Sequence, residues 1–371
     1  MDKFETEIYL RYKQIIEWQS ASTPLRPLVI PVPEQVRDDN RESPFHRENE
    51  LSSWRALPDR IQSDSCAVPR HVHMADLLDL YDVFCFDGYG TLYNRDRFVY
   101  PGAMDWFQLL RRAGKILRLV TNAASDVDGV LARAAEKRGF DFSTEETISS
   151  GSLLPKLVEQ LRSGVATNAA AGIVNETAGG TSSKPLELHE AYYIGRESGR
   201  NVLKACGITA VAMDAEPAEP IVAISSAKDT PETYARAVKI LQKPGAILLV
   251  LNSDAWAPKV PDENGVTARE PVSGALSERL RRDSMCEANG GEGCETYYLG
   301  KPFPQIWERV KASLPVGSRV LMIGDTLGTD VYGAKIAGFD SALVVGRNVP
   351  AEELEADEIA LGIRPDYYLE P

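Results

Sequence analysis

The sequence predicts an α/β fold in which a doubly wound, parallel sheet is interrupted by a second α/β segment. Apolar runs at 83–86 and 320–324 have the length of buried strands, and a third run at 116–121 leads into a polar loop. The stretch 101–115 has a helical pattern that begins with a proline and ends next to a glycine. Alternation of strands and helices on this scale predicts βαβ units and a parallel sheet.

Residues 1–74 differ from this pattern and are predicted to form an N-terminal arm. The stretch 2–19 can form an amphipathic helix, and prolines break the stretch 22–35. The apolar side chains of this helix are Ile8, Tyr9, Tyr12, Ile15, Ile16 and Trp18. Two interpretations stay open: the arm packs on the body of the chain, which the pattern favours, or it binds a partner or a second copy.

The rest of the chain divides into a core, a linker and an inserted cap. We expect the core to consist of residues 75–163 and 296–371, because the same style of strand and helix occurs on both sides of the interruption. Residues 164–184 are rich in Ala, Gly, Ser and Thr, which is typical of a flexible linker. Residues 185–295 contain a second set of strand and helix patterns and are expected to form an α/β cap.

The bulk composition argues against several classes of partner. The 371 residues carry a net charge of −13 and contain no block of Lys and Arg, so neither a nucleic-acid nor an anionic membrane surface is expected. No window reaches about 18 apolar residues, so no membrane span is expected. The five cysteines are scattered and lack CxxC spacing, which favours a reducing compartment. We therefore expect a cytoplasmic protein that binds a small molecule.

Polar side chains follow four of the predicted strands. They are Asp87 and Thr91, then Thr121 and Asn122, then Lys301, and last Asp325 and Asp330. An acid after a strand is often a helix cap and a Gly-Lys pair is often a turn, so each residue alone has an ordinary structural explanation. Together they match what phosphoryl transfer requires, because active groups in parallel sheets lie at the carboxyl ends of the strands.

A carboxylate nucleophile needs its charge neutralised before a phosphate can approach it. A hard divalent cation held by carboxylate oxygens supplies this, and Asp87 and Asp325 are the candidates to hold one. The transferring group also needs donors and a positive charge, which threonine hydroxyls, main-chain amides and Lys301 would provide. Asp330 could bind the cation directly, or orient its waters or Lys301.

The order of four short motifs resembles the haloacid dehalogenase superfamily. The motifs are DGYGTL at 87–92, VTNAAS at 120–125, LGKP at 299–302 and GDTLGTD at 324–330. The stretches YYIG, LNSD and GTDVYGAKIAGFDSALVVGR are similar to the subgroup, IIA, that contains nucleotide and p-nitrophenyl phosphate phosphatases. The resemblance covers about residues 75–371. It implies a Rossmann-like core with a large α/β (type 2) cap inserted between the second and third motifs.

The resemblance also implies roles for the motif residues. Asp87 would be the nucleophile that forms an aspartyl intermediate, and Lys301 would balance its charge. Asp325 and Asp330 would complete a Mg²⁺ site together with the main-chain carbonyl of Tyr89 or of the residue before it. The expected cofactor is therefore Mg²⁺.

Threonine and asparagine side chains would hold the phosphoryl oxygens. Thr121 and Asn122 have this role by resemblance, and Thr91 offers a further hydroxyl in the first motif. Asn252 and Asp254 match an Asn-x-Asp motif of the cap. Either these two residues face the substrate or they only form a strand-end turn.

Tyr89 departs from the phosphatases of this family, which have a second aspartate at its position. That aspartate protonates the leaving oxygen, and acid–base help of this kind is worth about 10²–10⁴-fold. A phenol with a reference pKa of about 10 is a poor general base near neutrality. Dehalogenases of the family do carry tyrosine here, but they use no metal and lack the acidic GDxxxTD pattern that this chain keeps.

We therefore predict a Mg²⁺-dependent hydrolase, a phosphatase that acts on a small phosphorylated metabolite through Asp87, with Tyr89 in place of the usual acid. Two alternatives stay open. One is a dehalogenase-like or other carbon-centre hydrolase in which Asp87 attacks carbon, and the other is a catalytically degenerate protein that binds a ligand or partner. A homodimer through the cap or the arm is a further expectation, and the substrate is not predicted.

Overall fold

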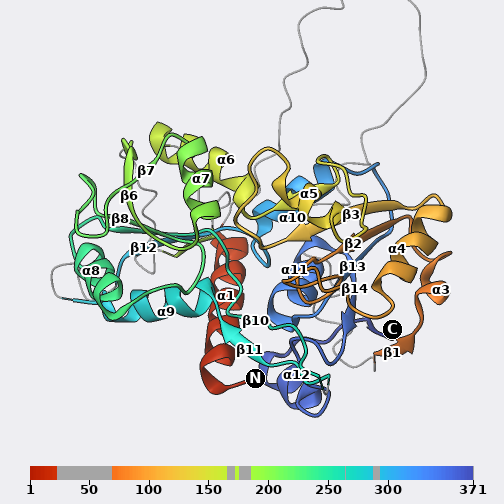
Figure 1. Cartoon of the computed structure of the whole chain (residues 1–371). Helices are drawn as coiled ribbons and strands as arrows, with labels where there is room; N and C mark the ends of the chain where they lie inside the picture. Colours follow the sequence, from red (N-terminus) through yellow and green to blue (C-terminus); the bar gives the residue numbers. More distant parts are fainter. Residues whose placement is uncertain (23–68, 165–171, 175–184, 264, 287–292, 371) are drawn as a thin grey trace, which may run out of the picture.

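The computed structural model describes residues 1–22, 69–164, 172–174, 185–263, 265–286 and 293–370, which form two mainly parallel sheets and one hairpin (Figure 1). The first sheet has the strand order β1-β15-β14-β13-β2-β3-β4, and every neighbouring pair is parallel. Its strands are β1 (Arg70–Val72), β2 (Val83–Phe86), β3 (Ile116–Thr121), β4 (Thr147–Ser149), β13 (Val320–Gly324), β14 (Asp340–Val344) and β15 (Tyr367–Leu369). The predicted α/β class with a parallel sheet is confirmed.

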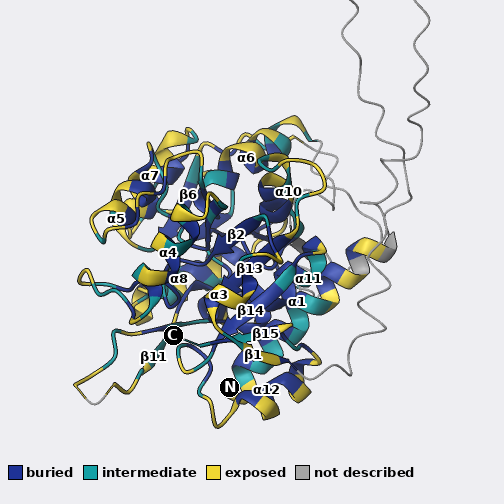
Figure 2. Cartoon of the chain, turned by 90° about the vertical axis from the view of Figure 1, so that its right-hand side faces the viewer, coloured by how far each residue is buried: buried dark blue, intermediate teal, exposed yellow. Residues whose placement is uncertain are grey.

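Both faces of this sheet are covered by helices, as β2 illustrates. Val83 and Cys85 pack in one apolar cluster, and Phe84 and Phe86 pack in another on the opposite face. Figure 2 shows β2 and β13 as buried strands inside the molecule. Strands buried on both faces read as continuous apolar runs, which explains why the sequence pattern identified them.

The helices around the first sheet follow its strands in chain order. They are α3 (Met74–Leu77), α4 (Ala103–Arg112), α5 (Val130–Glu136), η1 (Gly151–Leu153), α6 (Leu154–Ser163), α10 (Pro304–Ala312), the π-helical turn η3 (Leu327–Val331), α11 (Tyr332–Ala337) and α12 (Leu354–Leu361). Both α6 and α10 have a proline in the first turn, where no helical hydrogen bond is lost. The apolar cluster that contains Val83 includes side chains of α6, α10 and α11, and the cluster that contains Phe84 includes side chains of α3 and α4.

The second sheet has the strand order β5-β12-β9-β8-β6-β7 and is parallel except for β5. Its strands are β5 (Gly172–Val174), β6 (Glu190–Ile194), β7 (Thr209–Ala210), β8 (Ile221–Ile224), β9 (Ile247–Val250) and β12 (Glu295–Tyr298). The helices that follow these strands are α7 (Glu197–Ala205), α8 (Pro231–Leu241) and α9 (Ser273–Asp283). A separate antiparallel hairpin joins β10 (Trp256–Pro258) to β11 (Arg269–Pro271).

Strand pairing departs from the expected segment boundaries at three places. β12 pairs with β9, so the boundary expected at residue 296 cuts through a strand of the second sheet. β5 also belongs to that sheet, although it lies in the expected linker 164–184. β1 pairs with β15, so the first sheet extends into the expected arm. The division of the chain into domains stays a prediction.

The N-terminal helix α1 (Lys3–Ser22) packs on the body of the chain between α9 and α12 (Figure 1). Five of its six predicted apolar side chains are buried, namely Ile8, Tyr9, Tyr12, Ile15 and Ile16. The Tyr12 hydroxyl donates a hydrogen bond to the main-chain oxygen of Ser253 at 2.9 Å, and Glu5 pairs with Arg269 of β11 at 2.9 Å. These side chains are therefore engaged within the chain; the side chain of Trp18 and residues 23–68 lie outside the described part.

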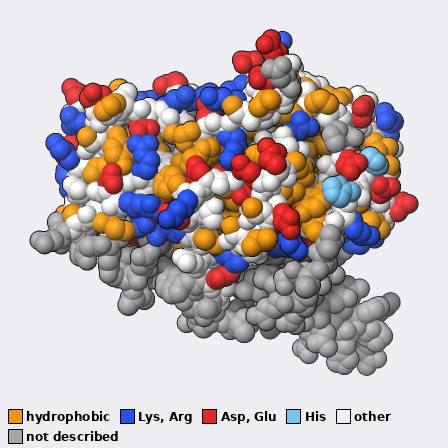
Figure 3. Space-filling model, turned by 90° about the horizontal axis from the view of Figure 1, so that it is seen from below, with side chains coloured by type: hydrophobic (Ala, Val, Ile, Leu, Met, Phe, Trp, Pro, Cys, Tyr) orange, Lys and Arg blue, Asp and Glu red, His pale blue; other side chains and the backbone are white. Residues whose placement is uncertain are grey.

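The surface of the described residues mixes both signs of charge. Figure 3 shows Lys and Arg side chains interspersed with Asp and Glu side chains over the face seen from below. Among the helices that the structure describes, none combines the length and apolar character needed to cross a membrane.

Candidate active site

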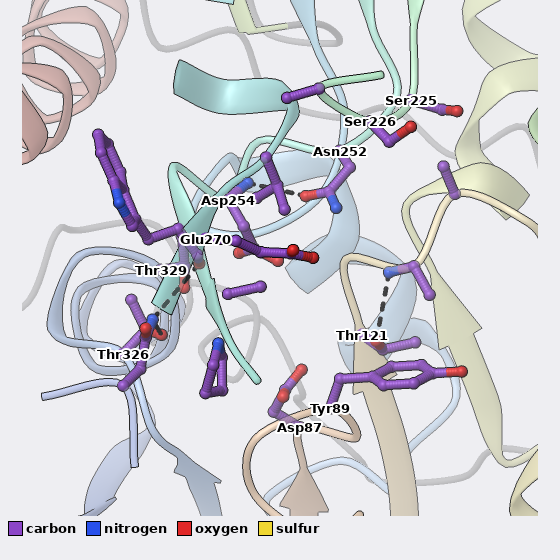
Figure 4. Close-up of a pocket in the computed structure, with 18 of the residues that line it drawn as sticks. Asp87, Tyr89, Thr121, Ser225, Ser226, Asn252, Asp254, Glu270, Thr326 and Thr329 are labelled. Atoms are coloured by element: carbon purple, nitrogen blue, oxygen red, sulfur yellow. Dashed lines mark hydrogen bonds between the residues drawn. The ribbon is translucent and has the colours of Figure 1, made fainter. Parts of the chain in front are cut away.

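The carboxyl ends of both sheets meet at one cavity with a volume of about 490 Å³ (Figure 4). Asp87, Thr121 and Asp325 reach it from the ends of β2, β3 and β13 in the first sheet. Asn252 and Lys301 reach it from the loops that follow β9 and β12 in the second sheet. Ligands of open α/β sheets bind at these strand ends, so the cavity is the candidate active site.

Lys301 is the central cation of this cavity. Its ammonium group lies 2.5 Å from Asp87 Oδ1 and 2.7 Å from Asp330 Oδ1, and it donates to the main-chain oxygen of Val120 at 2.9 Å. Only 1% of Lys301 is exposed. Burial alone lowers the pKa of a lysine, but Asp330 and Asp87 raise the pKa of Lys301 above its ordinary value, so it stays charged.

Asp330 connects Lys301 to the loop that holds Asp325. Its second oxygen accepts hydrogen bonds from the main-chain N–H groups of Asp325 at 3.2 Å and Thr326 at 3.1 Å. These contacts are possible because β13 runs directly into the π-helical turn η3, which folds Asp330 back onto the strand end. The turn thereby fixes both aspartates at the edge of the sheet.

The carboxylates outnumber the cation that faces them. Asp325 Oδ2 is buried and has no hydrogen-bond partner among the residues that the structure describes. Burial, followed by repulsion from Asp87 and Asp330, raises the pKa of Asp325 well above its ordinary value. Burial also raises the pKa of Asp87 to about 7, although Lys301 acts in the opposite direction. A group of acids with this excess of negative charge favours the binding of a further cation.

The donor set fits a hard divalent cation only if main-chain oxygen and water complete it. Within the described residues, no three side chains of Asp, Glu, His or Cys converge as a ready set of metal ligands. Mg²⁺ in proteins takes one or two carboxylates and keeps several waters, so such a set is not required. The unpartnered oxygen of Asp325, beside Asp87, supplies the carboxylate part of this arrangement.

The predicted phosphate-binding residues are not all in the cavity. Thr121 lines it, and its hydroxyl oxygen accepts a hydrogen bond from the main-chain N–H of Ala123 at 3.2 Å. Thr91 is fully buried and does not line the cavity. Asn122 does not line it either. Both side chains are buried beside the cavity, so their role in binding a phosphate stays a prediction.

Asn122 instead ties the two sheets together. Its amide nitrogen donates to Asp254 Oδ1 at 2.8 Å and to the main-chain oxygen of Lys301 at 3.0 Å. Its amide oxygen accepts from the main-chain N–H of Lys301 at 2.7 Å. A side chain on the loop after β3 thus positions groups that follow β9 and β12.

Asn252 and Asp254 satisfy both interpretations of the Asn-x-Asp motif. Both residues line the cavity, and Figure 4 shows them above Asp87. They also form a strand-end turn, because Asn252 Oδ1 accepts from the main-chain N–H of Asp254 at 2.8 Å. Burial raises the pKa of Asp254 to about 6, although Lys301 and the hydrogen bond from Asn122 lower it.

Tyr89 lines the cavity, but its hydroxyl is directed away from the Asp87 carboxylate (Figure 4). The phenol ring packs edge-on against Tyr93 with 5.1 Å between the ring centroids. The guanidinium carbon of Arg138 lies 5.9 Å from the Tyr89 ring centroid. These contacts hold the ring in the orientation seen, in which the hydroxyl does not face the acids of the cavity.

Several residues of the cavity were not predicted from the sequence. Arg95 pairs with Glu270 of β11 at 2.5 Å and thereby joins the first sheet to the hairpin. Arg196, Ser225, Ser226 and Lys228 line the far part of the cavity. Their position after a strand could have identified them, since Arg196 follows β6 and the two serines follow β8, just as Asp87 follows β2.

Comparison with protein families gives two matches along the chain. Residues 84–209 match the family described as haloacid dehalogenase-like hydrolase, and residues 298–370 match the family described as HAD-hydrolase-like. The first match includes Asp87 and Thr121, and the second includes Lys301 and both aspartates of the last motif.

Curated relatives of similar length are phosphatases by name, or carry the name chronophin. The chain is 27% identical over 315 residues to chronophin of Mus musculus, covering 82% of this chain and 95% of the relative. It is 27% identical over 306 residues to 4-nitrophenylphosphatase of Schizosaccharomyces pombe, covering 80% and 93%. It is 26% identical over 287 residues to glycerol-3-phosphate phosphatase of Homo sapiens, covering 72% and 80%.

Solved structures share the fold. A possible sugar phosphatase from Cytophaga hutchinsonii superposes with a TM-score of 0.61 at 22% identity, covering 82% of this chain and 98% of that chain. A glycerol phosphate phosphatase from Mycobacterium tuberculosis, solved with magnesium, superposes with a TM-score of 0.53 at 23% identity, covering 79% and 76%.

Proposed function

Because the chain belongs to the haloacid dehalogenase superfamily of hydrolases, we propose that it is a Mg²⁺-dependent phosphatase that acts on a small phosphorylated metabolite through Asp87. One observation carries the proposal: the buried Asp87 carboxylate faces the Lys301 ammonium group at 2.5 Å, in a cavity with an excess of acids. Phosphoryl transfer needs a nucleophile that lies beside a fixed positive charge, together with carboxylates that favour the binding of a further cation, and this cavity has that arrangement.

The proposed reaction has two displacements. A carboxylate oxygen of Asp87 attacks phosphorus, and a new O–P bond forms as the bond between phosphorus and the leaving oxygen breaks. The leaving oxygen departs as an anion or takes up a proton from water or from the substrate, and the phosphoryl group remains on Asp87 as an acyl phosphate. Water then attacks that phosphorus, which releases inorganic phosphate and restores the Asp87 carboxylate.

Other residues of the cavity stabilise charge during these steps. The Lys301 ammonium group and the Thr121 hydroxyl offer donors for the equatorial oxygens of the transferring group. A Mg²⁺ ion held by Asp87, Asp325 and the main-chain carbonyl of Tyr89 would neutralise charge between the nucleophile and the phosphoryl oxygens. Asp330 keeps Lys301 in place through its 2.7 Å contact.

The leaving group is expected to set the rate, because Tyr89 does not face it as an acid. A phenolic hydroxyl directed away from Asp87 supports no proton transfer to the leaving oxygen. Substrates that leave as stable anions, or that carry their own acid, would therefore react best. The names of the relatives, 4-nitrophenylphosphatase and glycerol-3-phosphate phosphatase, suggest small phosphomonoesters as the class to test.

Tyr89 also favours a second candidate, a hydrolase in which Asp87 attacks carbon. Dehalogenases of the superfamily carry tyrosine at this position and need no metal. The three further acids beside Asp87, namely Asp254, Asp325 and Asp330, weigh against this candidate, since carbon-centre attack does not need the cation that so many buried carboxylates favour. We therefore rank it second.

One experiment separates the two candidates. Purified protein is assayed with 4-nitrophenyl phosphate and with haloacids, each in MgCl₂ and in EDTA. We expect phosphate release that requires Mg²⁺ and disappears in the Asp87→Asn variant, whereas Asp141→Asn, which changes an exposed acid, keeps it. Halide release that persists in EDTA, without phosphate release in Mg²⁺, would contradict the proposal.

A further inference from the structure

The cavity is acidic at one end and basic at the other. Its catalytic end holds Asp87, Asp325 and Asp330 around Lys301, as described above. Its far end is lined by the exposed side chains of Arg196 and Lys228, and neither forms an ion pair with another residue that the structure describes. This separation of charge along one cavity is not needed for the transfer of a phosphoryl group alone.

The strand order of the second sheet sets the distance between the two ends. Lys301 follows β12 and Arg196 follows β6, and the order β12-β9-β8-β6 places three inter-strand steps between them. With about 4.8 Å for each step, the two main-chain positions lie roughly 14 Å apart across the sheet. Lys228 follows β8, which lies between β9 and β6 in this order. The loops that carry Arg196 and Lys228 are therefore three and two inter-strand steps away from the strand that leads to Lys301.

Fixed polar groups form the wall at the basic end. The Tyr193 hydroxyl donates to the main-chain oxygen of Arg196 at 2.7 Å and shares a hydrogen bond with Ser225 Oγ at 2.5 Å. These bonds hold the loop between β6 and α7, on which Arg196 lies. Ser226 Oγ in the same wall is buried and has no hydrogen-bond partner in the described structure, so its hydrogen-bonding capacity is unused.

An acid in the cavity wall offsets only part of the charge at this end. Glu270 lines the cavity and pairs with Arg95 at 2.5 Å, and the charge of Lys228 acts on it more weakly, in the same direction as Arg95, by lowering its pKa. Arg196 and Lys228 then remain as two positive charges that face the cavity together with hydroxyl groups. Cations beside hydroxyl donors recognise carboxylates and phosphates.

We infer that the substrate carries a second anionic group, which Arg196 and Lys228 bind, separated from the scissile phosphoryl group by a spacer the size of a sugar or an aromatic ring. This inference rests on the proposed phosphatase function and names its substrate class. The cavity volume of about 490 Å³ accommodates a ligand of this size. The charge of the second group, rather than its shape, selects the substrate.

A matched pair of aryl phosphates tests the inference. 4-Carboxyphenyl phosphate and 4-carbamoylphenyl phosphate have nearly the same size, and only the first carries a negative charge at its far end. The ratio of their kcat/KM values is measured in MgCl₂ for the wild type, Arg196→Ala, Lys228→Ala and the double variant. Arg200→Ala is the control, because Arg200 lies in the first turns of α7 close to Arg196, pairs with Glu197 at 3.3 Å and does not line the cavity.

We expect the wild type to prefer the carboxylate by about tenfold, the scale of one charge-assisted hydrogen bond. Each single variant lowers this ratio, mainly through a higher KM for the carboxylate, and the double variant brings it close to one. Arg200→Ala keeps the wild-type ratio. Equal kcat/KM values in the wild type, or a preference that survives in the double variant, would overturn the inference while phosphatase activity stands. If neither ester is hydrolysed, the proposed function itself falls, and the inference with it.

Discussion

Replacing Tyr89 by aspartate should change which phosphate esters the protein can hydrolyse. The Tyr89 hydroxyl is directed away from Asp87, so in the wild type the leaving oxygen must take its proton from water or from the substrate. An aspartate at this position supplies the acid that related phosphatases have. Acid help of this kind is worth about 10²–10⁴-fold, and it acts most on esters whose leaving group is a poor anion.

The assay compares 4-nitrophenyl phosphate with glycerol 3-phosphate, an aryl and an alkyl ester. We expect the wild type to favour the aryl ester strongly, and Tyr89→Asp to narrow that gap by at least about tenfold. The variant also loses the ring contacts with Tyr93 at 5.1 Å and Arg138 at 5.9 Å. Each contact is worth about 0.5–1.5 kcal/mol, so the free energy of unfolding should fall by about 1–3 kcal/mol.

Tyr89→Phe is the matched control for this experiment, because it removes the hydroxyl and keeps the ring. A wild type that hydrolyses both esters equally well would refute the reasoning, because the rate of hydrolysis would then not depend on the leaving group. A Tyr89→Phe variant that loses more than about tenfold on the aryl ester would also refute it, because the hydroxyl would then take part in the reaction.

Three further predictions concern buried polar contacts that hold the fold together. Tyr12→Phe leaves the buried oxygen of Ser253 without its hydrogen bond, so urea denaturation should show a loss of about 1–2 kcal/mol, and an unchanged midpoint would contradict this. Asn122→Ala removes four hydrogen bonds between the sheets and should lower both the melting temperature and kcat/KM; intact activity at full stability would show that these bonds position nothing. Burial alone would raise the pKa of Glu278, but its contacts with arginines, chiefly Arg281, lower this pKa in the folded protein. The stability that this ion pair contributes is therefore present above the unfolded pKa of about 4.5, and it is lost as the pH falls through the lower pKa of the folded state. Glu278→Gln should therefore be less stable than the wild type at pH 7 and lose less stability on acidification, and parallel pH profiles would count against it.

Local sequence patterns were enough to predict the first sheet and its strand ends. The run at 83–86 is apolar on both faces because helices cover both faces, and Asp87 follows it at the carboxyl edge. The same logic correctly predicted that Lys301 and Asp325 lie near Asp87. The amphipathic pattern of α1 also predicted which of its side chains are buried, but not the surface that they contact.

Contacts between segments distant in sequence could not be predicted in this way. The pairing of β12 with β9 puts Lys301 just after a strand of the second sheet, and no local pattern distinguishes that strand from a strand of the first. The hydrogen bonds of Asn122 follow from this pairing, so its role in linking the two sheets was not foreseen. The basic end at Arg196 likewise depends on the order of four strands, which spacing along the chain does not give.

The most direct test of the account is whether a phosphoryl group becomes attached to Asp87. The protein is mixed with an excess of 4-nitrophenyl phosphate in MgCl₂, quenched in acid within a single turnover and digested, and its peptides are analysed by mass spectrometry. We predict that the peptide containing Asp87 gains the mass of one phosphoryl group, and that the Asp87→Asn peptide does not. Release of phosphate without any such adduct, or an adduct on another residue, would contradict the central claim.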